Sequence, residues 1–405
     1  MPQLATLDKC TGCGACANIC NHSAIAMKGN VEGFLLPSVE QSSCVDCKLC
    51  EKVCPVLNSV PMGAEKPSVY AMWSNLDRTV SSSGGAFSAF ARLVLARGGV
   101  VFGTVYDDVM RLHHAETDTV DGLYAMRGSR YMQSDTEDSY RKIKDYLKGG
   151  RWVLFTGTPC QVAGLRSYLR KDYETLLTLD LACHGVPSSK IFHSYLEKLQ
   201  KRLGFAEKGL RIENYEFRRR EGWGKTPFLS TASNCRNLYG VDALYMEAFN
   251  ACAIFRESCY HCDYAKMPRV GDCTIADFWG IGRYGTAFPY NTRKGVSLVL
   301  VNTSKGKAAL NKLQDVFIEE RELKEALVEN HNLKVVSRRH PHRDEIVQAF
   351  LDENISLEEI DCKYHLLDKS IKGTVKTLAD KTGLFNVAKA AYDYYRVLKG
   401  KRQIK

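Results

Sequence analysis

Eight of the sixteen cysteines stand in two matching runs near the start of the 405-residue chain. Both runs have the spacing C-x2-C-x2-C-x3-C, and a proline follows the second run directly. Thiolates are soft ligands that favour iron–sulfur centres, and three of them two residues apart can wrap three corners of one cubane. The fourth thiolate, set further along, reaches the other cluster. The spacing therefore predicts two 4Fe–4S clusters, the first bound by Cys10, Cys13, Cys16 and Cys54 and the second by Cys20, Cys44, Cys47 and Cys50.

Two such runs in tandem are typical of bacterial two-cluster ferredoxins. Structural zinc usually pairs two shorter cysteine knuckles across a longer gap. A disulfide framework would need an oxidising compartment, and the first residues carry neither the basic nor the apolar segment of a signal peptide. We therefore expect a ferredoxin domain in a reducing cytoplasm. One departure from the pattern is Asn21, which stands where the first run would normally carry its proline.

Four further cysteines lie where an α/β sheet would hold a ligand. Cys160 and Cys183 each follow an apolar segment that we expect to be a buried strand, and the carboxyl ends of such strands form the ligand-binding edge of α/β sheets. Cys259 and Cys262 form a separate C-x2-C pair. These four residues are a candidate third metal site. Core packing of the first two, or zinc on the C-x2-C pair, are alternatives that the residues leave open.

Two polar loops could bind a phosphate or a flavin. The segment Ser81-Ser82-Ser83-Gly84-Gly85 opens a predicted helix that ends near Gly98, and free backbone N–H groups at such a start suit an anion. Residues 127–134 contain two arginines and several hydroxyls that could hold a diphosphate. On the residues alone, a plain serine N-cap explains the first loop better, and a solvated loop explains the second equally well.

The composition is that of a globular protein with two or three domains, with 45% hydrophobic residues and a net charge of +10. The most apolar stretch, 86–106, is interrupted by two arginines, so we expect no transmembrane segment. Residues 369–405 hold ten Lys and Arg against two Asp, which is +8 of the net charge. Because the chain shows neither a basic groove with interleaved aromatics nor a known module, nucleic-acid binding is not expected.

Apolar residues at helical spacing between Leu384 and Leu398 predict a helix in this basic tail. We expect that helix to dock on the body of the protein or on a partner. Peripheral contact with a membrane is the second interpretation, because the apolar face holds small residues and lacks Trp.

Five motifs, in order along the chain, resemble the beta subunit of the hydrogenases and dehydrogenases that reduce coenzyme F-420, a deazaflavin. The motifs lie within a match over roughly residues 66–310 and are SSSGGAFSA (81–89), RGSRYMQSD (127–135), GTPCQVAGL (157–165), LACHGVP (181–187) and CYHCDYAKMPRVGDCTIADFWGI (259–281). The resemblance implies FAD and one 4Fe–4S cluster, whose ligands fall on Cys160, Cys183, Cys259 and Cys262. It implies flavin contacts at Ser83, Gly84, Gly85, Arg130 and Gln133. Cys273 is a poor ligand candidate in this comparison.

The fold that we expect is a two-cluster ferredoxin module, then an α/β flavin-binding domain with a mixed sheet, then a helical C-terminal tail. The expected domains are 1–62 for the ferredoxin, 66–150 and 151–315 for the N-terminal and C-terminal beta-subunit regions, and 316–405 for the basic tail.

Clusters carry single electrons, whereas a flavin takes one or two and exchanges a hydride. The predicted function is therefore an iron–sulfur, flavin-dependent oxidoreductase that links a ferredoxin or other redox partner protein to a small organic substrate. Surface-polysaccharide metabolism is one setting of the family. The alternatives are an electron-transfer subunit without its own substrate, and a protein whose clusters are structural or sense redox state. No catalytic residue is predicted, and His184 is expected to be a hydrogen-bonded structural residue.

Overall fold

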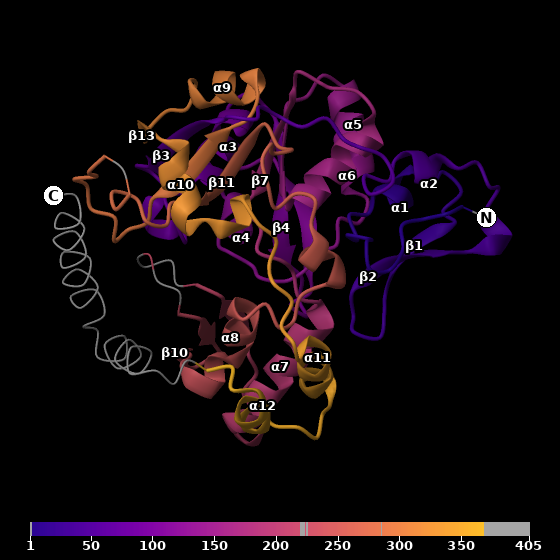
Figure 1. Cartoon of the computed structure of the whole chain (residues 1–405), viewed down its shortest axis with the longest axis vertical. Helices are drawn as coiled ribbons and strands as arrows, with labels where there is room; N and C mark the ends of the chain where they lie inside the picture. The colour runs from indigo at the N-terminus through magenta and orange to yellow at the C-terminus, as the bar shows by residue number, and fades with distance from the viewer. Residues whose placement is uncertain (1, 219–222, 224–225, 285, 368–405) are drawn as a thin grey trace.

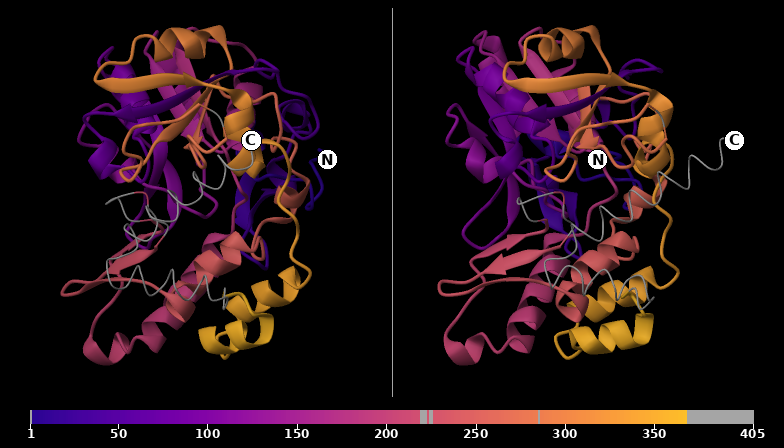
Figure 2. Two further views of the ribbon diagram at one scale, coloured as in Figure 1. Left: turned by 60° about the vertical axis from the view of Figure 1, so that its left-hand side comes forward. Right: turned by 90° about the vertical axis from the view of Figure 1, so that its left-hand side faces the viewer.

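A small N-terminal module, a body built on a β-sheet and a helical lobe lie next to one another in the computed structural model (Figure 1). The structure describes residues 2–218, 223, 226–284 and 286–367. The helical lobe stays beneath the sheet in two further views (Figure 2). None of the described helices is long and apolar enough to cross a bilayer.

The N-terminal module consists of short elements between cysteines, namely α1 (Ala15–Ile19), β1 (Ile25–Gly29), β2 (Leu35–Val39), η1 (Gln41–Ser43) and α2 (Leu49–Lys52). Strands β1 and β2 form an antiparallel hairpin. Helices this short are not stable alone, so packing must fix them. Helix α1 packs against α5 (Ser139–Lys148) and α6 (Pro159–Leu169) of the body, as Figure 1 shows.

Eight strands form the central sheet, in the order β13-β3-β12-β11-β7-β6-β4-β5. Their bounds are β3 Ser68–Ser74, β4 Val100–Tyr106, β5 Leu112–Thr117, β6 Val153–Gly157, β7 Leu176–Leu181, β11 Cys273–Asp277, β12 Ser297–Val301 and β13 Val316–Arg321. The inner strands β4, β6, β7 and β11 are parallel, and the outer pairs are antiparallel. Strands in such a parallel block are covered on both faces, which explains their continuous apolar sequences.

Helices cover both faces of the sheet. Leu154 of β6 faces one layer, made by α3 (Ala86–Leu95), α4 (Leu123–Met126) and α9 (Ser304–Leu310). Its neighbours Val153 and Phe155 face the opposite layer, where α5, α6 and the N-terminal module lie. Helix α10 (Leu323–Glu329) packs on that second face beside β3 and β12. The N-terminal module therefore shares its core with the body.

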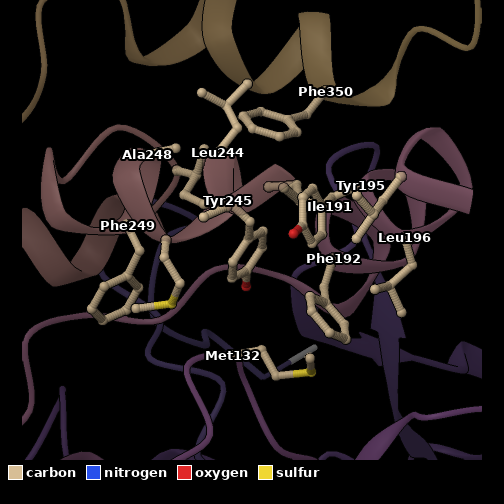
Figure 3. Packing of buried hydrophobic residues seen from close by; sticks show 14 of the residues in the cluster. Met132, Ile191, Phe192, Tyr195, Leu196, Leu244, Tyr245, Ala248, Phe249 and Phe350 are labelled. Atoms are coloured by element: carbon tan, nitrogen blue, oxygen red, sulfur yellow. The ribbon is translucent and has the colours of Figure 1, made fainter. Parts of the chain in front are cut away.

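The helical lobe has its own aromatic core, shown in Figure 3. Phe192 and Tyr195 of α7, Tyr245 of α8 and Phe350 of α11 are buried and point toward one another. The helices are α7 (Ser189–Arg202), α8 (Leu244–Asn250), α11 (Arg343–Leu351) and α12 (Leu357–Tyr364). A small antiparallel sheet has the strands β8 (Asn214–Glu216), β9 (Phe228–Ser230) and β10 (Cys235–Asn237). The other 3-10 turns are η2 (Arg78–Val80), η3 (Ala206–Lys208), η4 (Gly240–Ala243), η5 (Glu257–His261) and η6 (His331–Leu333).

The predicted fold class, a mixed α/β sheet domain behind a ferredoxin-like module, is confirmed. The domain boundary expected at residue 315 falls just before β13, which pairs with β3 at the edge of the sheet, and α11 packs on α7. The tail assigned to 316–405 thus contains body elements up to residue 367. An edge strand such as VFIEER has half-exposed, charged positions, so its sequence does not stand out. The predicted helix between Leu384 and Leu398 lies outside the described residues.

Candidate functional site

The outer end of the N-terminal module contains a small cavity of about 20 Å³ lined by four cysteines. Cys44, Cys47 and Cys50 come from the second run, and Cys20 comes from the end of the first. Cys20 follows α1 as its C-cap, and Cys50 lies in α2. The structure thus brings together the set that the spacing assigns to the second cluster.

The first cluster's set lies where the module meets the body. Burial, together with the neighbouring thiols of Cys10 and Cys54, raises the pKa of Cys16 to about 12. Burial also raises the pKa of Cys13 well above its ordinary value, with added repulsion from Cys16 and from Cys160 of the body. Cys54 therefore joins the three cysteines of the first run, and Cys13 stands next to the third set.

The third set is gathered from three separate segments of the body. Burial raises the pKa of Cys183 well above its ordinary value, and the thiols of Cys259, Cys160 and Cys262 follow as further causes. Burial likewise raises the pKa of Cys259 to about 12 and that of Cys160 to about 11. The thiols of Cys160, Cys259 and Cys262 thus all lie within electrostatic reach of Cys183.

The chemistry of these sets fits iron–sulfur clusters. Each set is four thiols, and thiolates are the ligands of 4Fe–4S centres. In the described part of the chain, no three His, Cys, Asp or Glu side chains converge closely enough for a single metal ion. Bound iron would also supply the positive charge that buried thiolates require.

Helix α6 positions Cys160 in its first turn. Thr158 and Gln161 form a capping box at the start of this helix, and Pro159 takes its first position. The Thr158 hydroxyl lies 3.1 Å from the Cys160 sulfur. A capped start holds the first turn rigidly, so the thiol has a fixed direction.

A buried ion pair ties the segments of Cys183 and Cys262 together. Arg269 donates to Asp180 near the end of β7 at 2.7 Å, and both side chains are at most 1% exposed. The guanidinium also donates to the carbonyl of Leu181 at 2.8 Å and to that of Tyr264. Asp180 in turn accepts from the backbone N–H of Gly271 at 2.7 Å. The pair therefore holds the chain after the C-x2-C pair against the strand that leads to Cys183.

Close contact joins the first set to α6. A side chain at Gly164 would meet the Cβ and Sγ of Cys13 at 2.9 and 3.0 Å. The hydroxyl of Tyr140 donates to the carbonyl of Cys13 at 2.8 Å. Arg141 donates to the carbonyls of Ala17, Asn18 and Cys20. Since Cys160 begins the same helix, only one turn of α6 separates the first and third sets.

The β1–β2 hairpin reaches from the module to the helical lobe. Glu32 at its tip pairs with Arg343 of α11, through bonds of 2.5 and 2.7 Å. Ser188 donates to the carbonyl of Glu32 at 2.5 Å, and Lys190 to that of Val31 at 3.0 Å. The module is therefore held to both parts of the protein.

A cavity of about 970 Å³ is lined by residues from the ends of the sheet strands and from the helical lobe. It is lined by the loops at 81–85 and 127–132, and also by Cys183 and His184 at the end of β7. The hydroxyls of Ser82 and Ser129 lie 3.1 Å apart, so the two loops singled out in the sequence are adjacent. The third cysteine set thus borders this cavity.

The structure separates the five predicted flavin contacts. Ser83, Gly85 and Arg130 line the cavity. Gly84 is packed on the sheet, because a Cβ there would meet the carbonyl of Met72 at 2.3 Å. Gln133 is buried, accepts from the N–H of Leu35 at 3.1 Å and faces the N-terminal module, and it is not among the residues that line the cavity. Met132 and Ser134, on either side of Gln133, line the cavity, whereas Gln133 itself contacts the N-terminal module.

The two loops that line the cavity differ in how their backbone is held. Gly85, with φ +88°, is the N-cap of α3, and no side chain caps that helix start. Arg130 donates to the carbonyls of Met126 and Gly128 at 3.1 and 3.4 Å. Arg130 therefore stabilises its own loop, and the Ser82–Ser129 contact joins that loop to the segment before α3.

The opposite wall of the cavity was not predicted. Arg218 pairs with Asp277 at the end of β11, and Trp223 donates to the same carboxylate at 2.6 Å. Trp223 stacks on Trp279 with ring centroids 4.8 Å apart. The motif ADFWG contains two of these residues, but nothing in the sequence joins them to Arg218 or Trp223, which are distant along the chain.

His184 has partners on both ring nitrogens. Its Nε2 lies 3.1 Å from the sulfur of Cys252, and its Nδ1 lies 3.0 Å from the side-chain amide of Asn332. These contacts support the expectation of a hydrogen-bonded structural residue. Cys273 is buried in the α3 layer, on the face of the sheet opposite to the N-terminal module. Cys235 and Cys362 are exposed.

A two-run cysteine module docked on an α/β body, with a third cysteine set beside a large cavity, defines the class of iron–sulfur electron-transfer proteins. The sequence profile of the 4Fe–4S dicluster domain matches residues 9–58. The profile of the C terminus of the coenzyme F420 hydrogenase/dehydrogenase beta subunit matches residues 150–326. Residues 150–326 are therefore similar to the C-terminal region of that oxidoreductase subunit, and residues 9–58, in front of it, are similar to the dicluster domain.

One solved structure similar to this chain is the F420-reducing nickel–iron hydrogenase complex from Methanosarcina barkeri, in its xenon derivative. The similarity covers 78% of this chain and 97% of that chain, at 15% identity and a TM-score of 0.42. No curated protein matches the chain.

Proposed function

We propose that the protein is an iron–sulfur flavoprotein oxidoreductase that moves electrons between a ferredoxin-type partner and a small organic substrate. One observation carries the proposal. The third cysteine set lies between the N-terminal module and the large cavity, because Cys160 begins the helix that touches Cys13, and Cys183 lines the cavity. The three cysteine sets and the cavity are thus arranged in sequence, from the N-terminal module to the helical lobe.

The roles of the residues follow from this order. Bound clusters would supply one-electron transfer, and a flavin would exchange one or two electrons or a hydride. The three cysteine sets would hold the clusters. Free backbone N–H groups at the start of α3, next to Ser83, suit the phosphates of FAD. The cavity, at the upper end of the usual range for ligand pockets, leaves room for a substrate.

The partner is expected at the outer end of the N-terminal module. Cys47 is exposed there, and the neighbouring Val45 is 59% exposed. Cys13, in contrast, is buried against the body. The second cluster would therefore meet an external donor, and the first would face inward.

The cavity also favours an enzyme over the alternative, an electron-transfer subunit without a substrate of its own. A subunit of that kind needs an exposed flavin edge for its partner, whereas this cavity is bordered by both the sheet and the helical lobe. The family resemblance of the sequence motifs makes a substrate of surface-polysaccharide metabolism part of the proposal.

Anaerobic purification with assays of iron, sulfide and flavin tests the proposal. We expect about twelve irons per chain, four for each cubane, and about one FAD. Cys183→Ala should reduce the iron to about eight, while Cys252→Ala, which removes a nearby thiol outside the sets, should leave about twelve. Eight irons in the wild type would remove the third cluster, and a chain without flavin would refute the flavoprotein.

A further inference from the structure

Arg256 is a buried cation at the junction of the N-terminal module and the body. Its side chain is 3% exposed. Nε donates to the carbonyl of Cys10 at 2.7 Å, and Nη1 donates to that of Leu35 at 3.0 Å. The guanidinium carbon also lies 5.8 Å from the ring centroid of Phe34. The side chain therefore holds the segment that carries the first ligand of the first cluster.

The backbone of the same residue holds the third set. The N–H of Arg256 donates to the carbonyl of Val186 at 2.9 Å, just beyond Cys183. Its carbonyl accepts from the N–H of Cys259 at 3.0 Å. Arg256 is also the N-cap of η5, the turn that contains Cys259. One residue thus connects two ligand loops of the third set to a ligand loop of the first.

The remaining nitrogen of this guanidinium, Nη2, is buried and has no hydrogen-bond partner in the structure. A buried donor on a charged group is costly to leave unsatisfied, so an acceptor is expected at this position. Burial raises the pKa of both Cys160 and Cys259, and the charge of Arg256 lowers both values. The cation therefore lies within electrostatic reach of two ligands of the third set.

We propose that Arg256 is a positioning residue that sets the potential of the third cluster, with Nη2 donating a hydrogen bond to one of its sulfurs. The proposal rests on the proposed function, since it requires that cluster. Reduction of a cluster by one electron adds one negative charge and breaks no bond. A guanidinium stays protonated at any accessible pH. Its fixed positive charge should stabilise the reduced state and raise the midpoint potential.

The test is a redox titration of the full-length protein, purified anaerobically and followed by electron paramagnetic resonance. The third cluster is identified by the signal that is absent from Cys259→Ser. Arg256→Gln should lower the equilibrium constant for reduction of the third cluster at least tenfold. For one electron, this corresponds to a midpoint potential that is lower by about 59 mV. Arg256→Lys, which keeps the charge, should shift it less.

Arg343→Gln is the matched control. Arg343 is equally buried, lies 5.8 Å from the same Phe34 ring and also binds the module, but through Glu32. Its removal should leave the third cluster within the error of the wild type. An unchanged potential in Arg256→Gln, or an equal shift in the control, would overturn the proposal.

Iron analysis keeps this test separate from that of the proposed function. Eight irons in the wild type contradict the third cluster itself, whereas twelve irons with an unchanged potential contradict only the role of Arg256. If Arg256→Gln fails to assemble the third cluster, Arg256→Lys decides the question. If Arg256→Lys holds twelve irons per chain and its reduction equilibrium changes less than tenfold, the role of the charge is supported. A larger change would overturn it. Failure of both variants to assemble, beside an intact Arg343→Gln, would make Arg256 a folding residue and would also overturn the proposal.

Discussion

Replacing Asp180 by Asn should selectively destabilise the third cysteine set. The substitution keeps the shape of the side chain but removes the charge that pairs with Arg269. Both side chains are at most 1% exposed, so water cannot replace the lost partner. Breaking a pair buried this deeply costs about 3–5 kcal/mol. The loss falls on the contact between the strand before Cys183 and the segment after Cys262.

The expected result is a fall in iron from about twelve to about eight per chain, because the ligands of the N-terminal clusters are untouched. The melting temperature should fall by about 6–10 °C, at roughly 2 °C per kcal/mol for a large domain. Asp172→Asn is the control, because Asp172 pairs with Lys305 at 2.8 Å but is 80% exposed. Exposed pairs contribute less than about 1 kcal/mol. An Asp180→Asn protein with full iron and the melting temperature of the control would refute this reasoning.

Three further predictions concern the relay, the tail and acid stability. Cys259→Ser should keep the two N-terminal clusters yet slow reduction of the flavin by a ferredoxin-type donor, because oxygen is a harder ligand than sulfur; stopped-flow traces at the wild-type rate in a cluster-deficient variant would exclude the relay. Deleting residues 383–405 should leave iron and flavin unchanged but weaken binding to an acidic partner or an anionic vesicle in sedimentation assays, and loss of flavin would instead make the segment part of the fold. Burial lowers the pKa of His114 to about 4, below the ordinary 6.5 of the unfolded chain, so its contribution is complete above pH 6.5 and is lost as the pH falls toward 4. Between pH 7 and pH 5 the free energy of unfolding should fall by about 2 kcal/mol because of this residue. The free energy of urea unfolding of His114→Phe should therefore depend less on pH than that of the wild type. Equal pH dependence in the two proteins would contradict the lowered pKa of His114.

The sequence predicted the two N-terminal cysteine sets because their spacing is itself the chemical signal. The cross-over of Cys20 and Cys54 follows from the C-x2-C-x2-C-x3-C pattern, and the structure brings both residues to the opposite run. The helix at 86–95 and the strand at 176–181 were also predictable, since each has the apolar periodicity of its type. Local patterns carry these features, so one sequence is enough.

Contacts between distant segments could not be predicted in this way. Gln133 stands in the middle of a loop motif, yet its partner Leu35 is 98 positions away. Arg256 precedes the C-x2-C pair without any pattern that marks it, and its contact with Cys10 spans 246 positions. The roles of such residues can be recognised only from the folded structure, in which the N-terminal module contacts the body. The family resemblance placed Gln133 among the expected flavin contacts, because a motif records proximity along the chain and not the direction of each side chain.

The position of β3 between β12 and β13 determines the order in which the protein can be assembled during synthesis. Residues 68–74 pair with residues 297–301 and 316–321, so the sheet is incomplete until about 240 further residues have been translated. At about 5–20 residues per second this delay is roughly 12–48 s. All eight cysteines of the N-terminal runs are translated before this delay starts, whereas the third set is complete only after Cys262. Iron delivery to the N-terminal module can therefore precede folding of the body, and the third set would be loaded later by a separate event.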